Sequence, residues 1–208
     1  MISTDNFLLE NAFNVFNKIY FDGSLPEVVI TIQSSPKSYG YITVHKVWKD
    51  NKDTYHEINI SAEHLTRDIE NVLATLLHEM VHLYCMVNSI EDTSNGGRYH
   101  NKRFKAEAEK RNLIIEYVHY IGHSKTSPSK RFIGVLKENG MYTNIDHCRT
   151  NVNSLIVPPT GGANVSNLGK RKTSTRKYVC NECGINIRAT RDVNIICGEC
   201  MCVMIKMD

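Results

Sequence analysis

The sequence predicts an α+β protein, in which a mainly helical domain packs on a small, mostly antiparallel sheet and is followed by a small metal-stabilised unit. Two stretches with helical apolar periodicity lie before residue 90, and short segments rich in β-branched and aromatic residues lie between them. Five of the seven cysteines fall within residues 180–208. Because 41% of the 208 residues are hydrophobic and 23% are charged, the chain has the composition of a globular protein that can bury a core.

The first half of the chain predicts two helices with three strands between them. An amphipathic helix should end at Asp22-Gly23-Ser24, be capped by one of residues 3–5, and bury one face. A second, longer helix should be buried on more than one side, so that any polar residue on it needs a reason. The first helix is expected to bury Leu8, Ala12, Val15, Phe16 and Ile19. The strands are expected at Val28–Ile32, Tyr39–Val44 and Glu57–Ile60, and the long helix at about Asp68–Val87.

The second half is expected to begin with a polar loop over Asn88–Gly97. A helix at about His100–Arg111 should follow, with Phe104 and Ala108 on its apolar side. Further elements are a strand over Leu113–Ile121, a polar loop over Gly122–Lys130 and another strand that includes Phe132, Ile133, Val135 and Leu136.

Residues 150–177 have the composition of a linker. They contain Pro158-Pro159, Gly161-Gly162, many Asn, Ser and Thr, and no acidic residue. The sequence therefore predicts three parts: a domain over residues 1–149, a basic flexible linker over 150–177 and a small unit over 178–208.

The long helix carries the string H-E-x-x-H at residues 78–82. Residues four apart lie on one face of a helix, so the imidazoles of His78 and His82 can hold one metal ion. Glu79 is offset by one residue from His78, which places its carboxylate beside the metal, where it can act as general base toward water. Because these polar residues interrupt the most apolar helix of the chain, a catalytic zinc site is favoured over a chance match.

A catalytic zinc usually has a third protein ligand and keeps one position open. Spacing alone leaves several downstream residues open as that ligand, with His100 only modestly favoured over Glu107. The candidates are His100, Glu107, Glu109, His119 and His123.

Several segments resemble one known family. They are Phe16–Pro26, Tyr39–Tyr41, Glu57–Ser61 and Thr75–His82, together with His100–Phe104, which matches an H-G-x-x-F pattern except that Asn101 replaces the glycine. On these segments residues 7–111 resemble the SprT-like metalloprotease domain, the family that includes Spartan. The resemblance implies a zincin-like fold, His78, His82 and His100 as zinc ligands, and Glu79 as general base.

The cysteines near the C-terminus form a C-x2-C…C-x2-C pattern, Cys180, Cys183, Cys197 and Cys200, with thirteen residues between the pairs. Two such knuckles present four thiolates to one tetrahedral ion, so we expect a structural zinc ribbon over residues 178–208. A segment this short would depend on the metal for its stability. Cys202 is expected to be a spare thiol, and Cys85 and Cys148 are expected to be inert.

The approach to the ribbon is basic. Lys170, Arg171, Lys172, Arg176 and Lys177 have no acidic residue near them to offset their charge. Such a run suits non-specific contact with the phosphates of single-stranded or duplex DNA, although a solvated linker is an equal alternative.

Taken together, the motifs predict a zinc-dependent endopeptidase with one catalytic and one structural zinc, which acts on protein substrates. The resemblance implies that these substrates are associated with or crosslinked to DNA. Two alternatives stay open: a zinc-ribbon DNA-binding or adaptor protein whose protease-like domain is a scaffold, and a general peptidase whose ribbon docks a protein partner. The oxyanion-stabilising group is also open among Tyr99, Arg103, His119 and His123.

No apolar run long enough for a membrane span and no signal peptide are visible in the sequence. The expected location is the cytoplasm, or the nucleoid or nucleus if the protein acts on DNA.

Overall fold

The computed structural model describes residues 2–145, 147–150 and 175–207. The chain divides into two compact units, residues 1–157 and 158–208. The three-part division expected from the sequence stays a prediction, because residues 151–174 of the expected linker lie outside the described residues.

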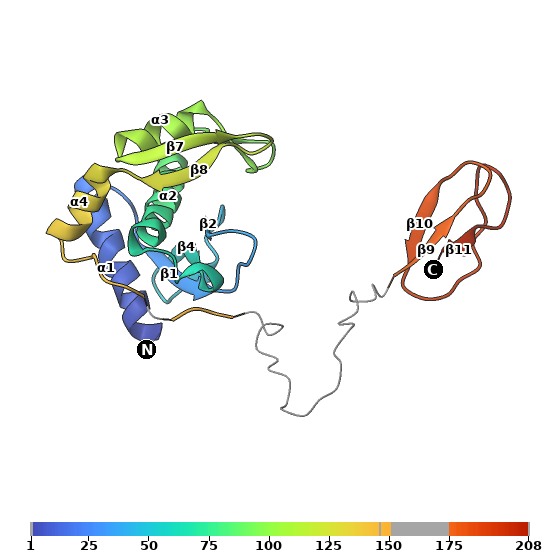
Figure 1. Cartoon of the computed structure of the whole chain (residues 1–208), viewed down its shortest axis with the longest axis horizontal. Helices are drawn as coiled ribbons and strands as arrows, with labels where there is room; N and C mark the ends of the chain where they lie inside the picture. The colour runs from blue at the N-terminus through green and yellow to red at the C-terminus, as the bar shows by residue number, and fades with distance from the viewer. Residues whose placement is uncertain (1, 146, 151–174, 208) are drawn as a thin grey trace, which may run out of the picture. The chain divides into compact units, whose positions relative to one another are not determined.

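The α+β class predicted from the sequence is confirmed. The described part of the N-terminal unit combines four α-helices with two four-stranded sheets (Figure 1). Its elements are α1 (Ile2–Tyr20), β1 (Val28–Gln33), β2 (Gly40–Ile42), β3 (Trp48–Lys49), β4 (Thr54–Ser61), the 3-10 turn Ala62–His64, α2 (Ile69–Val87), β5 (Thr93–Ser94), β6 (Tyr99–His100), α3 (Lys102–Lys110), β7 (Leu113–Val118), β8 (Gly122–Pro128) and α4 (Lys130–Glu138).

The first sheet is built around β4. Strand β1 pairs with it in parallel from Val28↔His56 to Gln33↔Ser61, while β2 and β3 pair with it antiparallel. Ile58 and Ile60 of β4 are fully buried in the main core. Strand β2 is an edge strand, so one of its sides remains free for other contacts.

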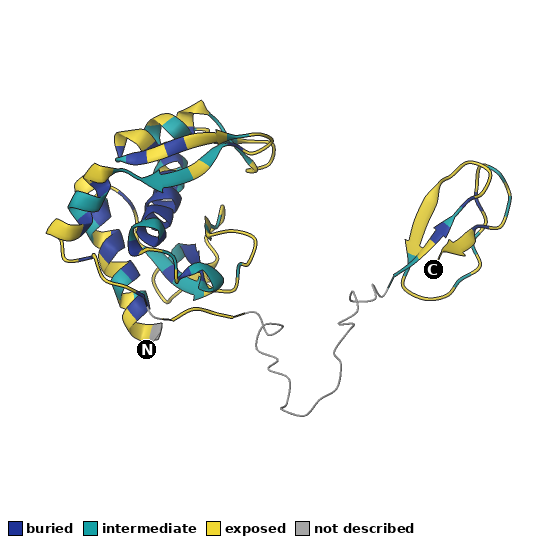
Figure 2. Ribbon diagram, in the orientation of Figure 1, coloured by how far each residue is buried: buried dark blue, intermediate teal, exposed yellow. Residues whose placement is uncertain are grey.

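Helix α2 is the centre of the N-terminal unit. It packs against α1, α3, β2, β4 and β8 (Figure 1), and almost its whole length is coloured as buried in Figure 2. This environment explains its apolar composition, which predicted the helix to within one residue at either end. Polar side chains on α2 are therefore held at fixed positions inside the protein.

Helix α1 buries a face that is rotated from the expected one. Leu9, Ala12, Phe13 and Phe16 are buried, whereas Ile19, which we expected on the buried face, is 43% exposed. The helix is apolar on more than one side, and the side that is buried is the one whose four residues follow the spacing i, i+3, i+4, i+7 and include both Phe13 and Phe16. The helix also begins at Ile2, so Ser3, Thr4 and Asp5 lie within it and not before it.

The sequence prediction for residues 122–136 is wrong. The expected polar loop is strand β8, and the expected strand around Phe132 is helix α4. The Ser129 hydroxyl caps α4 by accepting a hydrogen bond from the Phe132 N–H (3.1 Å), and Phe132 and Leu136, four residues apart, are both buried. A short apolar run is compatible with both the helical and the strand period, and here the Ser129 cap favours the helix.

The second sheet has the order β5-β6-β8-β7. Strand β5 lies in the segment expected to be a loop, and His100, which was expected to begin a helix, belongs to β6. Strands β5 and β6 pair antiparallel, and β6 meets β8 through the single pair His100↔Gly122. This pairing brings His100 alongside β8. None of the described helices is long and apolar enough to cross a membrane.

The described part of the C-terminal unit is a three-stranded antiparallel sheet of the order β10-β9-β11 (Asn186–Ala189, Arg176–Val179, Ile205–Met207). Its core is small and consists mainly of Tyr178, Cys180, Cys197 and Met204. So few apolar side chains supply little stability by themselves, which favours an additional stabilising element such as a metal.

Candidate metal centres

Three imidazoles meet at one point of the N-terminal unit. His78 and His82 lie four residues apart on α2, and His100 lies on β6. Their Nε2 atoms form a nearly equilateral triangle with sides of 3.2 Å (His78–His82), 3.2 Å (His78–His100) and 3.1 Å (His82–His100). Two nitrogen ligands of a tetrahedral zinc with Zn–N bonds of about 2.0–2.1 Å lie about 3.3 Å apart, so the triangle fits such an ion.

Neighbouring side chains fix the orientation of two of these rings. The Nδ1–H group of His82 donates to the carboxylate of Asp92 (2.5 Å), and that of His78 donates to the hydroxyl oxygen of Thr126 (2.7 Å). Each bond leaves the lone pair of Nε2 directed at the shared point, as metal ligands require. The third ring is held through its backbone, since the His100 N–H donates to the Ile121 carbonyl (3.0 Å).

The imidazoles are also electrostatically suited to a cation. Burial, with the neighbouring His82 and His100, holds the pKa of His78 well below its usual range. Burial and His82 lower the pKa of His100 to about 4. Both rings are therefore neutral near pH 7, which is the state that ligates a metal.

Glu79 lies beside this triangle on α2 and is 7% exposed. Burial raises the pKa of its carboxyl to about 7, although the Ile42 N–H donates to the carboxylate. A carboxyl that titrates near neutral pH can both accept and return a proton.

Strand β2 lies close to α2 beside Glu79. This close approach requires a glycine at position 40, because a Cβ there would lie 2.9 Å from the Asn59 carbonyl oxygen and 3.0 Å from Thr75 Cγ2.

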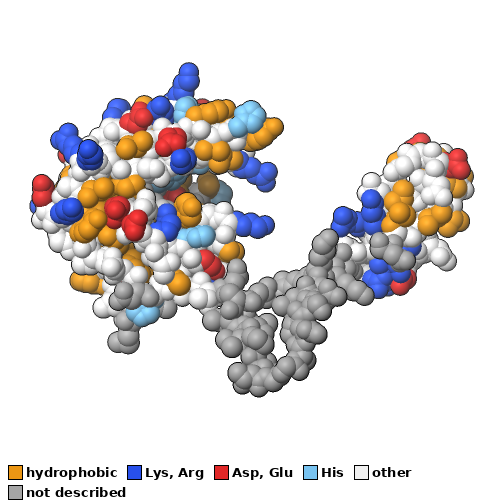
Figure 3. Space-filling model, viewed as in Figure 1, with side chains coloured by type: hydrophobic (Ala, Val, Ile, Leu, Met, Phe, Trp, Pro, Cys, Tyr) orange, Lys and Arg blue, Asp and Glu red, His pale blue; other side chains and the backbone are white. Residues whose placement is uncertain are grey.

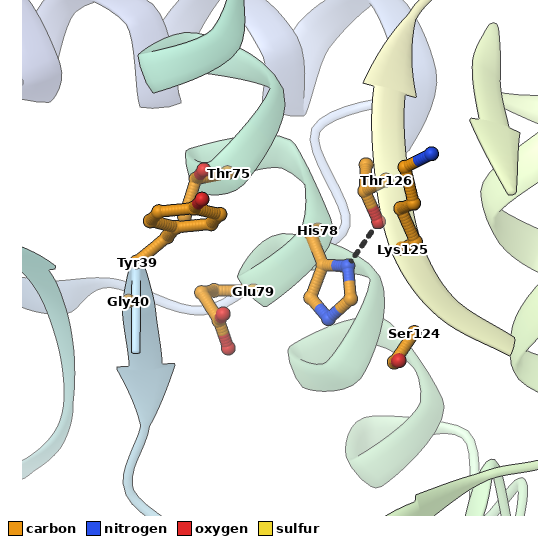
Figure 4. Close-up of a pocket in the computed structure, with 8 residues that line it drawn as sticks. All are labelled: Tyr39, Gly40, Thr75, His78, Glu79, Ser124, Lys125 and Thr126. Carbon is orange, nitrogen blue, oxygen red and sulfur yellow. Dashed lines mark hydrogen bonds between the residues drawn. The ribbon is translucent and has the colours of Figure 1, made fainter. Parts of the chain in front are cut away.

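Two hollows flank His78 and Glu79. One, of about 180 Å³, extends toward Tyr39, Thr75 and the β8 residues 124–126, and Figure 4 shows Glu79 and His78 facing it. The other, of about 400 Å³, extends along β2 and is more apolar; Ile42, Val44 and Met86 contribute to it. The imidazoles and Glu79 thus lie in a cleft that is open on both sides.

The remaining candidates for a third ligand are engaged elsewhere. Glu107 pairs with Lys110 (2.6 Å) and Arg111 (2.8 Å), and Glu109 pairs with Lys105 (3.6 Å). His119 packs on Tyr120 and His123 on Tyr117, with ring centroids 4.0 and 5.4 Å apart. Of the five candidates, only His100 reaches the triangle.

A second candidate centre lies in the C-terminal unit. The thiol sulfurs of Cys180, Cys183, Cys197 and Cys200 all lie within 4.8 Å of one another, and Cys183 and Cys197 are 3.6 Å apart. Two sulfur ligands of a tetrahedral zinc with Zn–S bonds of about 2.3 Å lie about 3.8 Å apart, so four thiolates here fit one closed site. The Cys183 backbone N–H lowers the pKa of Cys180 to about 6, which favours its thiolate.

The two cysteine knuckles have the same backbone form. Gly184 N–H donates to the Cys180 carbonyl, and Met201 N–H donates to the Cys197 carbonyl. Gly184 has φ +74° and Met201 has φ +56°, so both turns use the left-handed conformation. Cys202 lies close to this cluster, with its sulfur 3.4 Å from that of Cys180.

The other two cysteines stand apart from both centres. Cys85 is fully buried, and burial raises its pKa to about 12, so it remains a thiol. Cys148 is exposed.

The predicted basic run is described only in part. Lys170, Arg171 and Lys172 lie outside the described residues. Arg176 pairs with Asp192 (2.9 Å), while Lys177 is exposed on β9. On the face of the N-terminal unit in Figure 3, Lys and Arg side chains are interspersed with acidic and apolar ones.

Reasoning from the sequence missed Asp92, Thr126 and Gly122. Asp92 follows His82 by ten residues and lies in a polar stretch, where carboxylates are common. No regular spacing relates it to the H-E-x-x-H motif. Thr126 lies in the segment wrongly expected to be a loop. Both are found only once the chain is folded around α2.

The comparisons with known proteins agree with this geometry. The model of the SprT-like family matches residues 9–121, which is more than half of the chain. No curated protein and no solved structure matches significantly.

Proposed function

Because the chain belongs to the SprT-like family, a family of zinc-dependent protease-like domains, we propose that it is a zinc-dependent endopeptidase. The observation that carries the proposal is the juxtaposition of three imidazoles and a buried carboxyl. His78, His82 and His100 would hold the catalytic zinc, and Glu79 would be the general base. Cys180, Cys183, Cys197 and Cys200 would hold a structural zinc, because four thiolates leave no open position.

Zinc bound by three imidazoles supplies a Lewis acid toward water and toward the carbonyl of the scissile peptide bond. Glu79 takes a proton from the attacking water while the water oxygen bonds to the carbonyl carbon. When the C–N bond breaks, the nitrogen keeps the electron pair and Glu79 returns the proton to it, so that one amide and one water give a carboxylic acid and an amine. Burial of Glu79 suits both steps, because it raises the pKa of the carboxyl and so makes the carboxylate a stronger base.

Strand β2 provides a place for an extended substrate. The Ser61 N–H donates to the Tyr39 carbonyl and the Thr43 N–H donates to the Glu57 carbonyl, so these residues bond to β4. The backbone groups of Gly40 and Ile42 between them point to the free edge, toward Glu79. A peptide that pairs with this edge would pass directly over the base.

The proposed substrates are proteins associated with DNA. Support comes from the acid-free run that contains Lys170, Arg171, Lys172, Arg176 and Lys177, which suits phosphate contact. The mixed charges on the face of the N-terminal unit in Figure 3 offer no comparable basic patch.

Replacing Glu79 tests the mechanism. Glu79→Gln keeps the size of the side chain and should keep the zinc content, because the carboxylate is not one of the three ligands. Peptide hydrolysis should fall at least about 100-fold, the usual effect of losing a positioned acid–base group. Full activity in this variant would contradict the mechanism, and zinc-loaded wild type that binds DNA without cleaving DNA-bound proteins would favour the adaptor alternative.

A further inference from the structure

We infer that the hydroxyl of Ser124 donates a hydrogen bond to the carbonyl oxygen of the scissile peptide bond as negative charge develops on that oxygen. This inference rests on the proposed peptidase function and deepens it. No bond is made or broken at Ser124; its O–H group stabilises the charge that arises when water attacks the carbonyl carbon.

Hydrolysis requires such a donor, and the residues suggested by the sequence do not supply it. Tyr99 is hydrogen-bonded to Tyr117, and Arg103 pairs with Glu91 (3.6 Å). His119 and His123 pack on tyrosine rings. None of the four side chains lines either hollow beside Glu79.

Four hydroxyl side chains do line the smaller hollow, and two of them are already engaged. The Thr75 hydroxyl donates to the Asn71 carbonyl (3.0 Å) and accepts from Arg67 (3.0 Å). The Thr126 hydroxyl accepts from Nδ1 of His78, the ring nitrogen that points away from the shared point of the three imidazoles, so this hydroxyl lies behind the ring. The side-chain hydroxyls of Tyr39 and Ser124 have no hydrogen-bond partner among the described residues, so their O–H groups are free to bind substrate.

The positions of these two hydroxyls differ. Figure 4 shows Tyr39 on the same side as Glu79, while Ser124 lies on the other side of the His78 ring. A general base and an oxyanion donor must reach opposite sides of the reacting carbonyl, because one holds the attacking water and the other holds the oxygen. Tyr39 is also 54% exposed, whereas Ser124 is half-buried. The geometry therefore favours Ser124.

Strand β8 holds Ser124 in place. Ser124 precedes Thr126 by two residues, so the two side chains share the face of the strand that looks toward α2. Pairing with β7 at Ile115↔Thr126 and Glu116↔Lys125 fixes the strand directly after Ser124, and the register shift between Glu116 and Val118 makes Ser124 part of a β-bulge, which bends the strand at this residue. One strand thus orients a ligand imidazole and presents a hydroxyl to the same cleft.

The test compares Ser124→Ala with Ser124→Thr, which keeps a hydroxyl. Ser127→Ala is the matched control, because Ser127 lies on the opposite face of β8. In Ser124→Ala, kcat should fall about 100- to 1,000-fold, with zinc content and KM unchanged, since the hydrogen bond strengthens only as charge develops. Ser124→Thr should recover most of this loss, and Ser127→Ala should match wild type.

A second measurement does not depend on turnover. A phosphinic peptide carries a tetrahedral anionic group in place of the scissile amide, and its affinity for the zinc-loaded full chain can be measured by calorimetry. Ser124→Ala should weaken this affinity by a factor similar to its loss of kcat, whereas Ser127→Ala should not. Equal affinity in wild type and Ser124→Ala, or no binding by wild type, would overturn the assignment.

The outcomes separate this inference from the proposed function. If Glu79→Gln abolishes hydrolysis while Ser124→Ala does not reduce it, the peptidase function stands and the role of Ser124 is wrong. If Tyr39→Phe shows the loss of kcat expected of Ser124→Ala, the hydrogen-bond donor to the carbonyl oxygen is Tyr39 and the role of Ser124 is wrong. If zinc-loaded wild type cleaves no peptide, the proposed function fails, and phosphinate binding still decides whether Ser124 recognises an anionic oxygen.

Discussion

Asp92 shows how one residue outside the metal site controls a ligand. Its carboxylate accepts the Nδ1–H of His82 at 2.5 Å and is 7% exposed. The bond selects the tautomer of His82 that directs Nε2 at the other two imidazoles. Asp92→Ala should therefore weaken zinc binding at this site about 10- to 100-fold, measured by competition with a chromophoric chelator.

The adjacent Glu91 provides the control for Asp92. Its side chain is 87% exposed and forms an ion pair with Arg103 (3.6 Å) on the surface. Glu91→Ala removes the same charge from the same loop and should leave the zinc affinity unchanged. Equal affinities of the Asp92 and Glu91 variants would mean that Asp92 does not orient His82.

At this scale, the sequence predicted the residues that obey a spacing rule. His78, Glu79 and His82 follow from helical spacing, and His100 followed from the family resemblance. Asn101 replaces the glycine of the family pattern without distorting the backbone, because its φ is −91° and its side chain accepts the Arg103 (2.7 Å) and Phe104 (3.3 Å) N–H groups as a helix cap. Asp92 and Thr126 could not be predicted, since no periodicity connects them to the motif.

Among the secondary-structure elements, the junction of β6 and β8 decides where the third imidazole lies. Gly122 has φ +72°, and a Cβ there would lie 2.2 Å from the His100 carbonyl oxygen. Gly122→Ala should therefore destabilise the fold by about 1–3 kcal/mol and weaken zinc binding at the imidazole site. Thermal unfolding and zinc affinity of the full chain measure both effects.

Gly134→Ala is the control for Gly122→Ala. Gly134 lies inside α4, and a Cβ there would meet no atom within 4 Å. Alanine in a helix interior is favoured over glycine by roughly 0.5–1 kcal/mol, so this variant should be at least as stable as wild type. If both glycine variants behaved alike, close packing at Gly122 would not be what positions His100.

The elements that the sequence predicted well are those whose burial is one-sided or complete. Helix α2 was recognised because burial on several sides makes nearly every residue apolar. Strand β8, Gly-His-Ser-Lys-Thr-Ser-Pro, was missed because the face that should be apolar instead carries Ser124 and Thr126, which line the cleft. A functional surface thus removed the pattern by which a strand is recognised.

At the scale of the whole molecule, the described residues form two candidate metal centres, one in each compact unit. We expect the intact chain to bind two zinc ions, measured by mass spectrometry of metals in the purified protein. Cys197→Ser with Cys200→Ser should lower the content to one, because two thiolates cannot close a structural site. Peptide hydrolysis without DNA should be retained, since the imidazoles and Glu79 all lie in the other unit.

His82→Ala is the reciprocal variant. It should also lower the zinc content to one, but it should abolish hydrolysis. A protein that lost both ions through either change would contradict the independence of the two centres.

The last prediction concerns the basic run that precedes Cys180 in the sequence. If Lys170, Arg171, Lys172, Arg176 and Lys177 contact phosphates, the chain should bind DNA without sequence preference and with micromolar or weaker affinity at physiological salt. The logarithm of affinity should fall linearly with the logarithm of salt concentration. Five contacts give a slope of about −3.5 on single strands, since each neutralised phosphate contributes about −0.7.

Replacing Lys170, Arg171 and Lys172 together with alanine should flatten this slope by about 2, because three of the five contacts are lost. The zinc content should not change, since none of the three is a ligand. The control variant replaces Lys37, Lys49 and Lys52, which are exposed on the N-terminal unit, and removes the same net charge. A salt titration of the three proteins separates a local contact from an effect of overall charge: only the first variant should lose slope and, with it, any stimulation of proteolysis by DNA. Superimposable curves for all three would mean that the run is a solvated linker and that DNA does not recruit this protein through it.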